Sequence, residues 1–181
     1  MRLVSCIPTR DIALTFLGAS LGLILSVCAD DEASVMYSLR NAYPDWQPRG
    51  IVDVGANRGG WTTLVQEEIY PGIKTFMVEA SPFHTGALKE TKKKFEKFVD
   101  FEIAVLTESD GKEINFFDNT AFNGSGGTGN SIFQEKSVHY EGLKPEVRTT
   151  MKLDTLLKTN NMDYVDYLKL DVQVDCQIAA R

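Results

Sequence analysis

The sequence predicts an α/β fold with a mostly parallel sheet, because short apolar runs alternate with segments of helical periodicity. The runs "GIVDVGA" (50–56), "IKTFMVEAS" (73–81) and "VDFEIAVL" (99–106) have the length and composition of buried strands. Segments with a 3.6-residue apolar period separate them, at 61–70 and 84–98. Alternation of this kind is typical of a parallel sheet covered by helices.

Each predicted helix carries an apolar stripe, and "ASVMYSLRNAY" (33–43) forms an additional helix before the first strand, ended by "PDWQP". The residues expected to face the core are Val35, Met36, Leu39 and Tyr43 in the first helix; Trp61, Leu64, Val65 and Ile69 in the second; and Leu88, Phe95 and Phe98 in the third.

The second half of the chain predicts shorter elements. "KEINFFD" (112–118) and "EVRTTMKL" (146–153) alternate like half-exposed strands. "DTLLKTNN" (154–161) predicts a short helix capped by Asp154. "YVDYLKLDV" (164–172) predicts a last buried strand.

The N-terminal segment is a separate hydrophobic unit. Residues 12–29 contain no charged side chain, and "DDE" follows them directly. A membrane anchor and a cleaved signal peptide, with cleavage after "VCA", both remain open, since length does not separate them. A buried helix is less expected, because no face of the segment is polar. Either alternative sends the chain into the secretory pathway, with the globular part lumenal or extracellular.

Residues 1–29 are therefore expected to be a signal peptide or signal anchor, 30–49 a helical lead-in and 50–181 one domain. Without residues 1–29 the chain has 17 basic and 24 acidic side chains, a net charge of −7. This charge argues against a nucleic-acid binder, which needs a basic footprint. One cysteine, Cys176, lies beyond the leader, so neither a disulfide framework nor a metal site with cysteine ligands is predicted.

The loop after the first predicted strand, "GANRGG" (55–60), has the character of a nucleotide-binding turn. A glycine-rich turn between a strand and a helix presents backbone N–H groups at the edge of a sheet. The second glycine of a dinucleotide motif is missing, and Asp53 would repel a pyrophosphate. S-adenosylmethionine carries an ammonium and a sulfonium and no phosphate, so Asp53 favours it. Glu79, at the end of the second strand, is placed to bind both ribose hydroxyls.

Four motifs, "VDVGANRGGWT", "FMVEASP", "KLDTLL" and "YLKLDVQ", resemble the FkbM-type methyltransferases in their order and intervals. The resemblance covers about residues 50 to 173. It implies a Rossmann-like, doubly wound sheet and S-adenosylmethionine-dependent O-methylation of a glycan or small hydroxyl compound. It further implies that the methionine end lies beside Asp53, Gly55, Asn57 and Gly59, the ribose beside Glu79 and the adenine near Ala104. Asp171 would lie at the tip of a strand beside the transferred methyl group.

The resemblance stops at Gln173, where family members usually continue with a glycine and a glutamate. We therefore expect a C-terminally truncated member of the family, with an incomplete substrate side and weak activity. The alternative is a non-catalytic form that binds only S-adenosylmethionine or a partner chain. The strand near 164–172 would then be an apolar edge available for self-association. His139 is a second candidate catalytic residue, as a general base, although a surface histidine is the simpler interpretation.

Overall fold

A four-stranded parallel sheet forms the centre of the protein in a computed structural model, which describes residues 32–119, 130–134, 140 and 142–171. Its strands lie in the order β3, β2, β1, β7. Their bounds are β1 Gly50–Val54, β2 Lys74–Glu79, β3 Val99–Ile103 and β7 Tyr167–Leu170. All three strand pairs are parallel, which confirms the α/β class predicted from the sequence.

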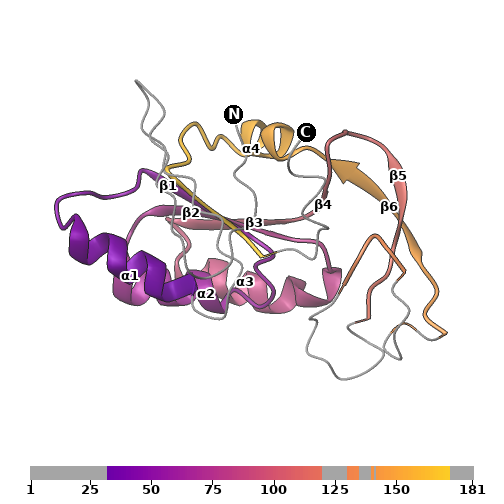
Figure 1. Ribbon diagram of the computed structural model, residues 1–181, viewed down its shortest axis with the longest axis horizontal. Helices are drawn as coiled ribbons and strands as arrows, with labels where there is room; N and C mark the ends of the chain where they lie inside the picture. Colours follow the sequence, from indigo (N-terminus) through magenta and orange to yellow (C-terminus); the bar gives the residue numbers. More distant parts are fainter. Residues whose placement is uncertain (1–31, 120–129, 135–139, 141, 172–181) are drawn as a thin grey trace.

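Helices lie on both faces of this sheet (Figure 1). One face carries α1 (Glu32–Ala42), α2 (Gly60–Leu64) with the π-helix Val65–Ile69 that continues it, and α3 (Thr85–Lys94), which follows the 3-10 turn Pro82–His84. The opposite face carries α4 (Leu153–Thr159). Successive side chains of a strand point to opposite faces, so each strand contributes to two separate cores.

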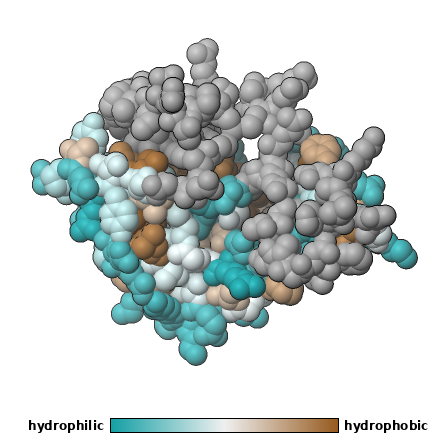
Figure 2. All heavy atoms as spheres, turned by 60° about the horizontal axis from the view of Figure 1, so that its bottom comes forward, coloured by the Kyte–Doolittle hydropathy of each residue, from teal (hydrophilic) through white to brown (hydrophobic). Residues whose placement is uncertain are grey.

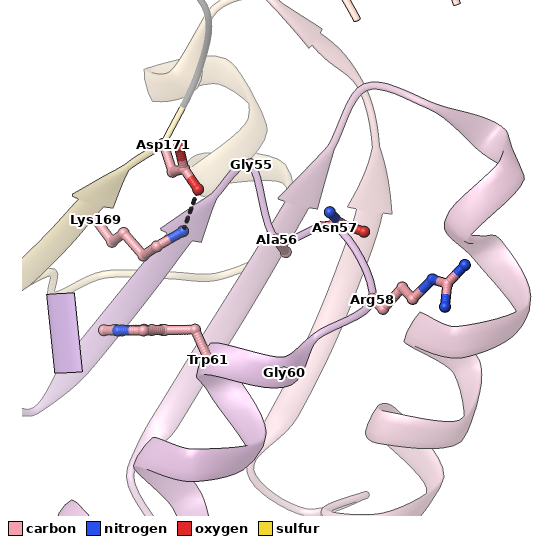
Figure 3. Close-up of a pocket in the computed structure, with 8 residues that line it drawn as sticks. All are labelled: Gly55, Ala56, Asn57, Arg58, Gly60, Trp61, Lys169 and Asp171. Carbon is pink, nitrogen blue, oxygen red and sulfur yellow. Dashed lines mark ion pairs between the residues drawn. The ribbon is translucent and has the colours of Figure 1, made fainter. Parts of the chain in front are cut away.

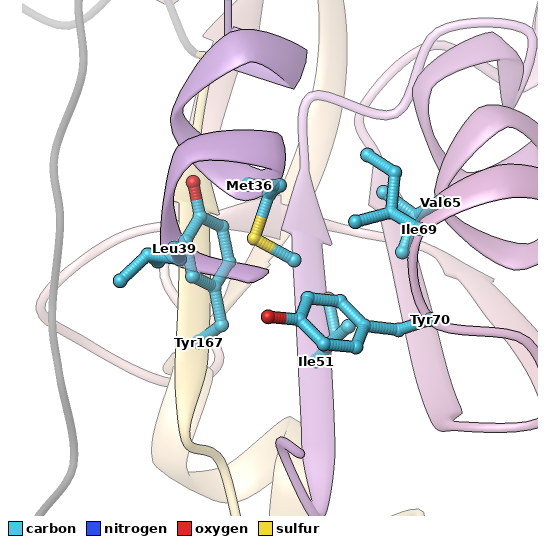
Figure 4. Close-up of a cluster of buried hydrophobic side chains, with 7 residues drawn as sticks. All are labelled: Met36, Leu39, Ile51, Val65, Ile69, Tyr70 and Tyr167. Atoms are coloured by element: carbon cyan, nitrogen blue, oxygen red, sulfur yellow. The ribbon is translucent and has the colours of Figure 1, made fainter. Parts of the chain in front are cut away.

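The first core lies between the sheet and α1, α2 and the π-helix (Figure 4). Its buried side chains are Met36, Leu39, Ile51, Val65, Ile69, Tyr70 and Tyr167. The second core, beneath α4, contains Val52, Val54, Phe76, Val78, Leu156, Met162 and Leu168. The alternation along β1, with Ile51 in one core and Val52 in the other, fixes the face on which its polar residue Asp53 must lie.

A smaller sheet in the order β4, β6, β5 stands beside the first. Its strands are β4 Val105–Leu106, β5 Glu113–Phe116 and β6 Glu146–Met151. The single strand predicted over 99–106 is therefore two strands in two sheets, separated by Ala104. The backbone N–H of Ala104 donates to the carbonyl oxygen of Glu79 at 2.9 Å, which ends the pairing of β3 with β2.

The predicted cap of the helix after β6 is wrong. Lys152 occupies the N-cap position of α4, and Asp154 lies within the first turn. The carboxylate that binds this helix start comes from Asp110, which accepts the Lys152 backbone N–H at 2.7 Å and the Thr155 hydroxyl at 2.8 Å. The Lys152 N–H is the largest cause of a lowered pKa at Asp110. A side chain distant in sequence has replaced the local cap.

Two residues of the predicted apolar stripes are exposed rather than buried. Tyr43 is 51% exposed and Phe98 is 42% exposed. Both lie past the last residue of their helix, because α1 ends at Ala42 and α3 at Lys94, so the helical period no longer directs them inward.

An ion pair joins the amino-terminal ends of β1 and β7, at the edge of the sheet opposite to the glycine loop. The Arg49 guanidinium donates to both carboxylate oxygens of Asp166, at 2.9 and 2.8 Å, and its backbone N–H donates to one of them. The side-chain hydrogen bond from Arg49 is the main reason that the pKa of Asp166 is lowered.

Figure 2 shows the side of the protein that carries α1, α2 and α3, where the described surface is mostly hydrophilic and hydrophobic residues form small patches. Within the described residues, no helix has the length and apolar character needed to cross a bilayer. The leader predicted at 1–29 lies outside those residues, as does Val172 at the end of the last predicted strand.

Candidate functional site

A cleft of about 400 Å³ lies at the carboxyl ends of β1 and β7. Its walls are formed by the loop and first turn of helix after β1 and by the end of β7 (Figure 3). The lining residues are Gly55, Ala56, Asn57, Arg58, Gly60, Trp61, Lys169 and Asp171. The chain runs from β1 to β2 and β3 on one side, whereas β7 lies on the other. Open α/β sheets bind ligands at such a reversal of strand order.

The loop that forms one wall requires left-handed backbone at three positions. Gly55, Asn57 and Gly59 have φ angles of 79°, 51° and 76°. A Cβ atom at Gly55 would come within 1.9 Å of the Asp171 carbonyl oxygen, so only glycine allows β7 to pass this close. Gly59 is buried against Thr91 of α3 and lies behind the cleft rather than on its wall. The two glycines therefore accommodate the neighbouring backbone at Gly55 and a helix at Gly59.

Asp53 lies beneath the cleft and is fully buried. Its carboxylate accepts the Thr62 hydroxyl at 2.7 Å and the Lys169 ammonium at 3.1 Å. Asp53 and Lys169 are register partners on the adjacent strands β1 and β7, so the pair is built into the sheet. The negative charge predicted to face a ligand is thus balanced by a buried lysine. Asp53 does not line the cleft, so a negative charge that attracts a ligand there must come from another residue.

Lys169 is one of the site residues that the sequence interpretation missed, together with Arg58 and Trp61. The Lys169 side chain is only 5% exposed, and it lies 5.7 Å above the centre of the Trp61 ring. A lysine in the apolar run "YLKL" is itself a signal, since a buried ammonium needs a partner carboxylate. The partner is the acidic residue of the other apolar strand, Asp53 of "IVDV".

Asp171 is the acidic side chain on the cleft wall. It follows β7 directly, and its side chain is 69% exposed. One carboxylate oxygen lies 3.6 Å from the Lys169 ammonium, as the dashed line in Figure 3 marks. Its backbone is fixed, because the Asp171 N–H donates to the Val54 carbonyl at 2.9 Å. Asp171 therefore offers an exposed negative charge at the end of β7, the strand end at which the resemblance implies a site residue.

Glu79 ends β2 and holds two loops together. Its carboxylate accepts the backbone N–H of Asn57 at 2.8 Å and that of Ser81 at 2.8 Å. The residue is 8% exposed and is not among those that line the cleft. A carboxylate has about four acceptor sites, so two remain after these bonds. The structure thus gives Glu79 an anchoring function, with capacity left for hydroxyl groups.

Within the described residues, two polar atoms of the cleft are buried without a hydrogen-bond partner. They are the Nε1 donor of Trp61 and the Oδ1 acceptor of Asn57. The flat face of Trp61 is stacked on Tyr167, with ring centres 5.9 Å apart. Leaving a buried donor or acceptor unpaired costs roughly 1–3 kcal/mol each. A polar ligand in the cleft is one way to recover part of that cost.

One further predicted site residue, Ala104, is not among the residues that line this cleft. Ala104 is at the junction of the two sheets, bonded to the Glu79 carbonyl. His139 lies outside the described residues. No group of three or more His, Cys, Asp or Glu side chains able to hold a metal occurs in the part of the chain that the structure describes.

The cleft thus combines a glycine loop, an aromatic surface, an exposed carboxylate and a buried ion pair at the reversal of a parallel sheet. Comparison with known proteins adds no assignment: no protein-family model matches the sequence, and no curated protein does.

Proposed function

We propose that this chain is an S-adenosylmethionine-dependent methyltransferase with a Rossmann-like fold, similar to the FkbM type. Its acceptor is a hydroxyl group of a glycan or small compound in the secretory pathway. The observation that carries the proposal is the cleft at the reversal of strand order, with the glycine loop on one wall and Asp171 on the other. In open α/β sheets this is the position at which nucleotide-like ligands bind.

The charges at the cleft support a ligand that is cationic at one end. Asp53 is paired with Lys169, so the unburied acidic charge is that of Asp171. The sulfonium and ammonium of S-adenosylmethionine would lie toward Asp171. Its carboxylate would meet Arg58, an exposed cation on the glycine-loop wall. Opposite charges within about 4–6 Å favour the charged form of each group.

The neighbouring elements support the remainder of the ligand. The Glu79 carboxylate retains acceptor sites beside the loop, and ribose hydroxyls are suitable donors. Trp61 presents a partly exposed aromatic surface on the cleft wall, and its N–H needs an acceptor. Enzymes of this class act largely by holding two reactants in line, which provides much of their rate enhancement.

The test is calorimetric titration of the full chain with S-adenosylmethionine. Gly55→Ala should abolish binding, because the added Cβ would clash with the Asp171 backbone at 1.9 Å. Gly86→Ala is the matched control, since nothing lies within 4 Å of a Cβ added on this helix and the affinity should not change.

A wild-type chain that does not bind S-adenosylmethionine would refute the proposal. Binding that is equally strong in both alanine variants would move the ligand away from this cleft. Transfer of a labelled methyl group to a panel of oligosaccharides and small alcohols tests the reaction itself. Binding without transfer would make the chain a binding protein rather than an enzyme.

A further inference from the structure

Four polar side chains form a continuous series from the interior of the protein to the cleft. The Thr62 hydroxyl donates to Asp53 at 2.7 Å, Lys169 donates to the other Asp53 oxygen at 3.1 Å, and the same ammonium lies 3.6 Å from Asp171. The series passes from α2 through β1 and β7 to the cleft wall. Its burial decreases along the way, from 0% exposure at Asp53 and 5% at Lys169 to 69% at Asp171.

The inner half of this series is rigid. The Lys169 stem lies within a strand, its ammonium is paired with a fully buried carboxylate, and the Trp61 ring lies beneath it at 5.7 Å. Moving the Lys169 ammonium away from Asp53 would leave the buried carboxylate without a counter-charge, which is energetically costly. The Lys169 charge is therefore fixed in space by Asp53, which does not line the cleft, and by the Trp61 ring, which does.

The outer half of the series is less constrained, because the Asp171 side chain is exposed. Within the described part of the chain, the Lys169 ammonium is the only charged group at ion-pair distance from Asp171. An exposed aspartate side chain samples several rotamers, and a fixed cation on one side favours the rotamer that faces it. The second carboxylate oxygen is then left toward the cleft.

We propose that Lys169 is a positioning residue, which orients the Asp171 carboxylate so that it faces the cationic end of the ligand. This inference rests on the proposed function, since S-adenosylmethionine supplies the cationic end. Asp53 acts one step further back, by fixing Lys169. A fixed acceptor costs less to order on binding than a mobile one, which is how the pair would raise affinity.

A direct contact between Lys169 and an anionic part of the ligand is the competing arrangement. The two differ in one respect. If Lys169 acts through Asp171, removing either residue removes the same interaction, and the losses do not add. If Lys169 binds the ligand itself, the losses add.

The experiment uses two probes and the full chain. S-adenosylmethionine carries the charged end, and 5′-methylthioadenosine has the same nucleoside without that end. The variants are Asp171→Asn, the pair Asp53→Asn with Lys169→Met, and all three substitutions together. Replacing both members of the buried pair avoids a stranded charge. The control is Lys92→Met with Asp100→Asn, the same chemical changes at an exposed ion pair of 2.6 Å on α3 and β3.

We expect Asp171→Asn to weaken S-adenosylmethionine binding roughly tenfold, as for loss of a hydrogen bond to a charged group. The pair variant should lose a similar factor, and the triple variant no more than either. Affinity for 5′-methylthioadenosine should be unchanged in all of them, and the control should bind both probes as the wild type does.

Three results would overturn the inference while leaving the proposed function intact. These are a pair variant with wild-type affinity for S-adenosylmethionine, losses that add in the triple variant, and an equal loss for both probes in the pair variant, which would show a purely structural role. Absence of wild-type binding to S-adenosylmethionine would instead refute the proposed function and the inference with it.

Discussion

Lys169→Met is expected to destabilise the fold strongly, because it breaks a buried ion pair. It leaves Asp53, which is fully buried, with the Thr62 hydroxyl at 2.7 Å but without its cation. Two unit charges 3.1 Å apart attract by about 5 kcal/mol at an effective dielectric constant of about 20. Breaking a buried pair by removing one partner typically costs about 3–5 kcal/mol, which agrees. We therefore expect a loss of about 3–5 kcal/mol in the free energy of unfolding.

The assay is urea unfolding of the full chain followed by circular dichroism, with the midpoint and slope compared between variants. Asp53→Asn added to Lys169→Met should recover most of the loss, since the neutral amide still accepts the Thr62 hydroxyl and no charge is stranded. Lys92→Met, at an exposed pair, should cost less than about 1 kcal/mol. A loss below about 1 kcal/mol for Lys169→Met, or no recovery in the double variant, would refute the buried-pair argument.

Three further predictions concern single residues. Asp166→Asn should make the free energy of unfolding less dependent on pH in the acid range. Hydrogen bonding to Arg49 lowers the pKa of Asp166 in the folded state. The stabilisation by Asp166 is therefore fully present above its pKa in the unfolded chain and is lost as the pH falls through its pKa in the folded protein. Unfolding at pH 7 and at pH 2 measures this, and equal acid sensitivity in the variant would contradict it. Glu79→Ala should weaken S-adenosylmethionine binding by on the order of 1–3 kcal/mol in calorimetry, and an unchanged affinity would place the ribose elsewhere. Trp61→Phe removes an unpaired buried donor and keeps most of the aromatic surface stacked on Tyr167. It should therefore lower the free energy of unfolding by less than about 1.5 kcal/mol, as measured by thermal unfolding. A much larger loss would show that the Trp61 N–H has a hydrogen-bond partner in solution.

The elements of the central sheet could be predicted because each strand is short, apolar and enclosed by turn residues. β1, β2 and β7 lie within the predicted runs for this reason. The boundary at Ala104 could not be predicted, since "IAVL" (103–106) is continuously apolar and the break depends on the Glu79 carbonyl and a second sheet. The prediction of the α4 cap was wrong for the same reason, because Asp110 is 42 residues from the Lys152 backbone N–H that it accepts.

For the cleft, the sequence indicated the loop and the two acidic strand ends but not how their charges are distributed. Asp53 and Lys169 are 116 residues apart, and only the parallel register of β1 and β7 brings them together. The left-handed conformation of Asn57, with a φ of 51°, was likewise not predicted, because it is held by the distant Glu79 carboxylate. The local sequence pattern can therefore indicate at which edge of a sheet a candidate site lies. It cannot indicate which charged residues pair with one another, because that depends on tertiary contacts.

The packing at Gly55 has a consequence for attempts to alter ligand preference by mutagenesis. The wall of the cleft at Gly55 is backbone against backbone, with the Asp171 carbonyl occupying the space of any Gly55 side chain, so a library that varies this position would mostly displace the loop. Gly60 offers the opposite case on the same wall. Nothing lies within 4 Å of a Cβ added there, and its φ is not in the left-handed range, so a new side chain can be introduced without moving the loop. Selectivity is thus more readily altered from the rim than from the base.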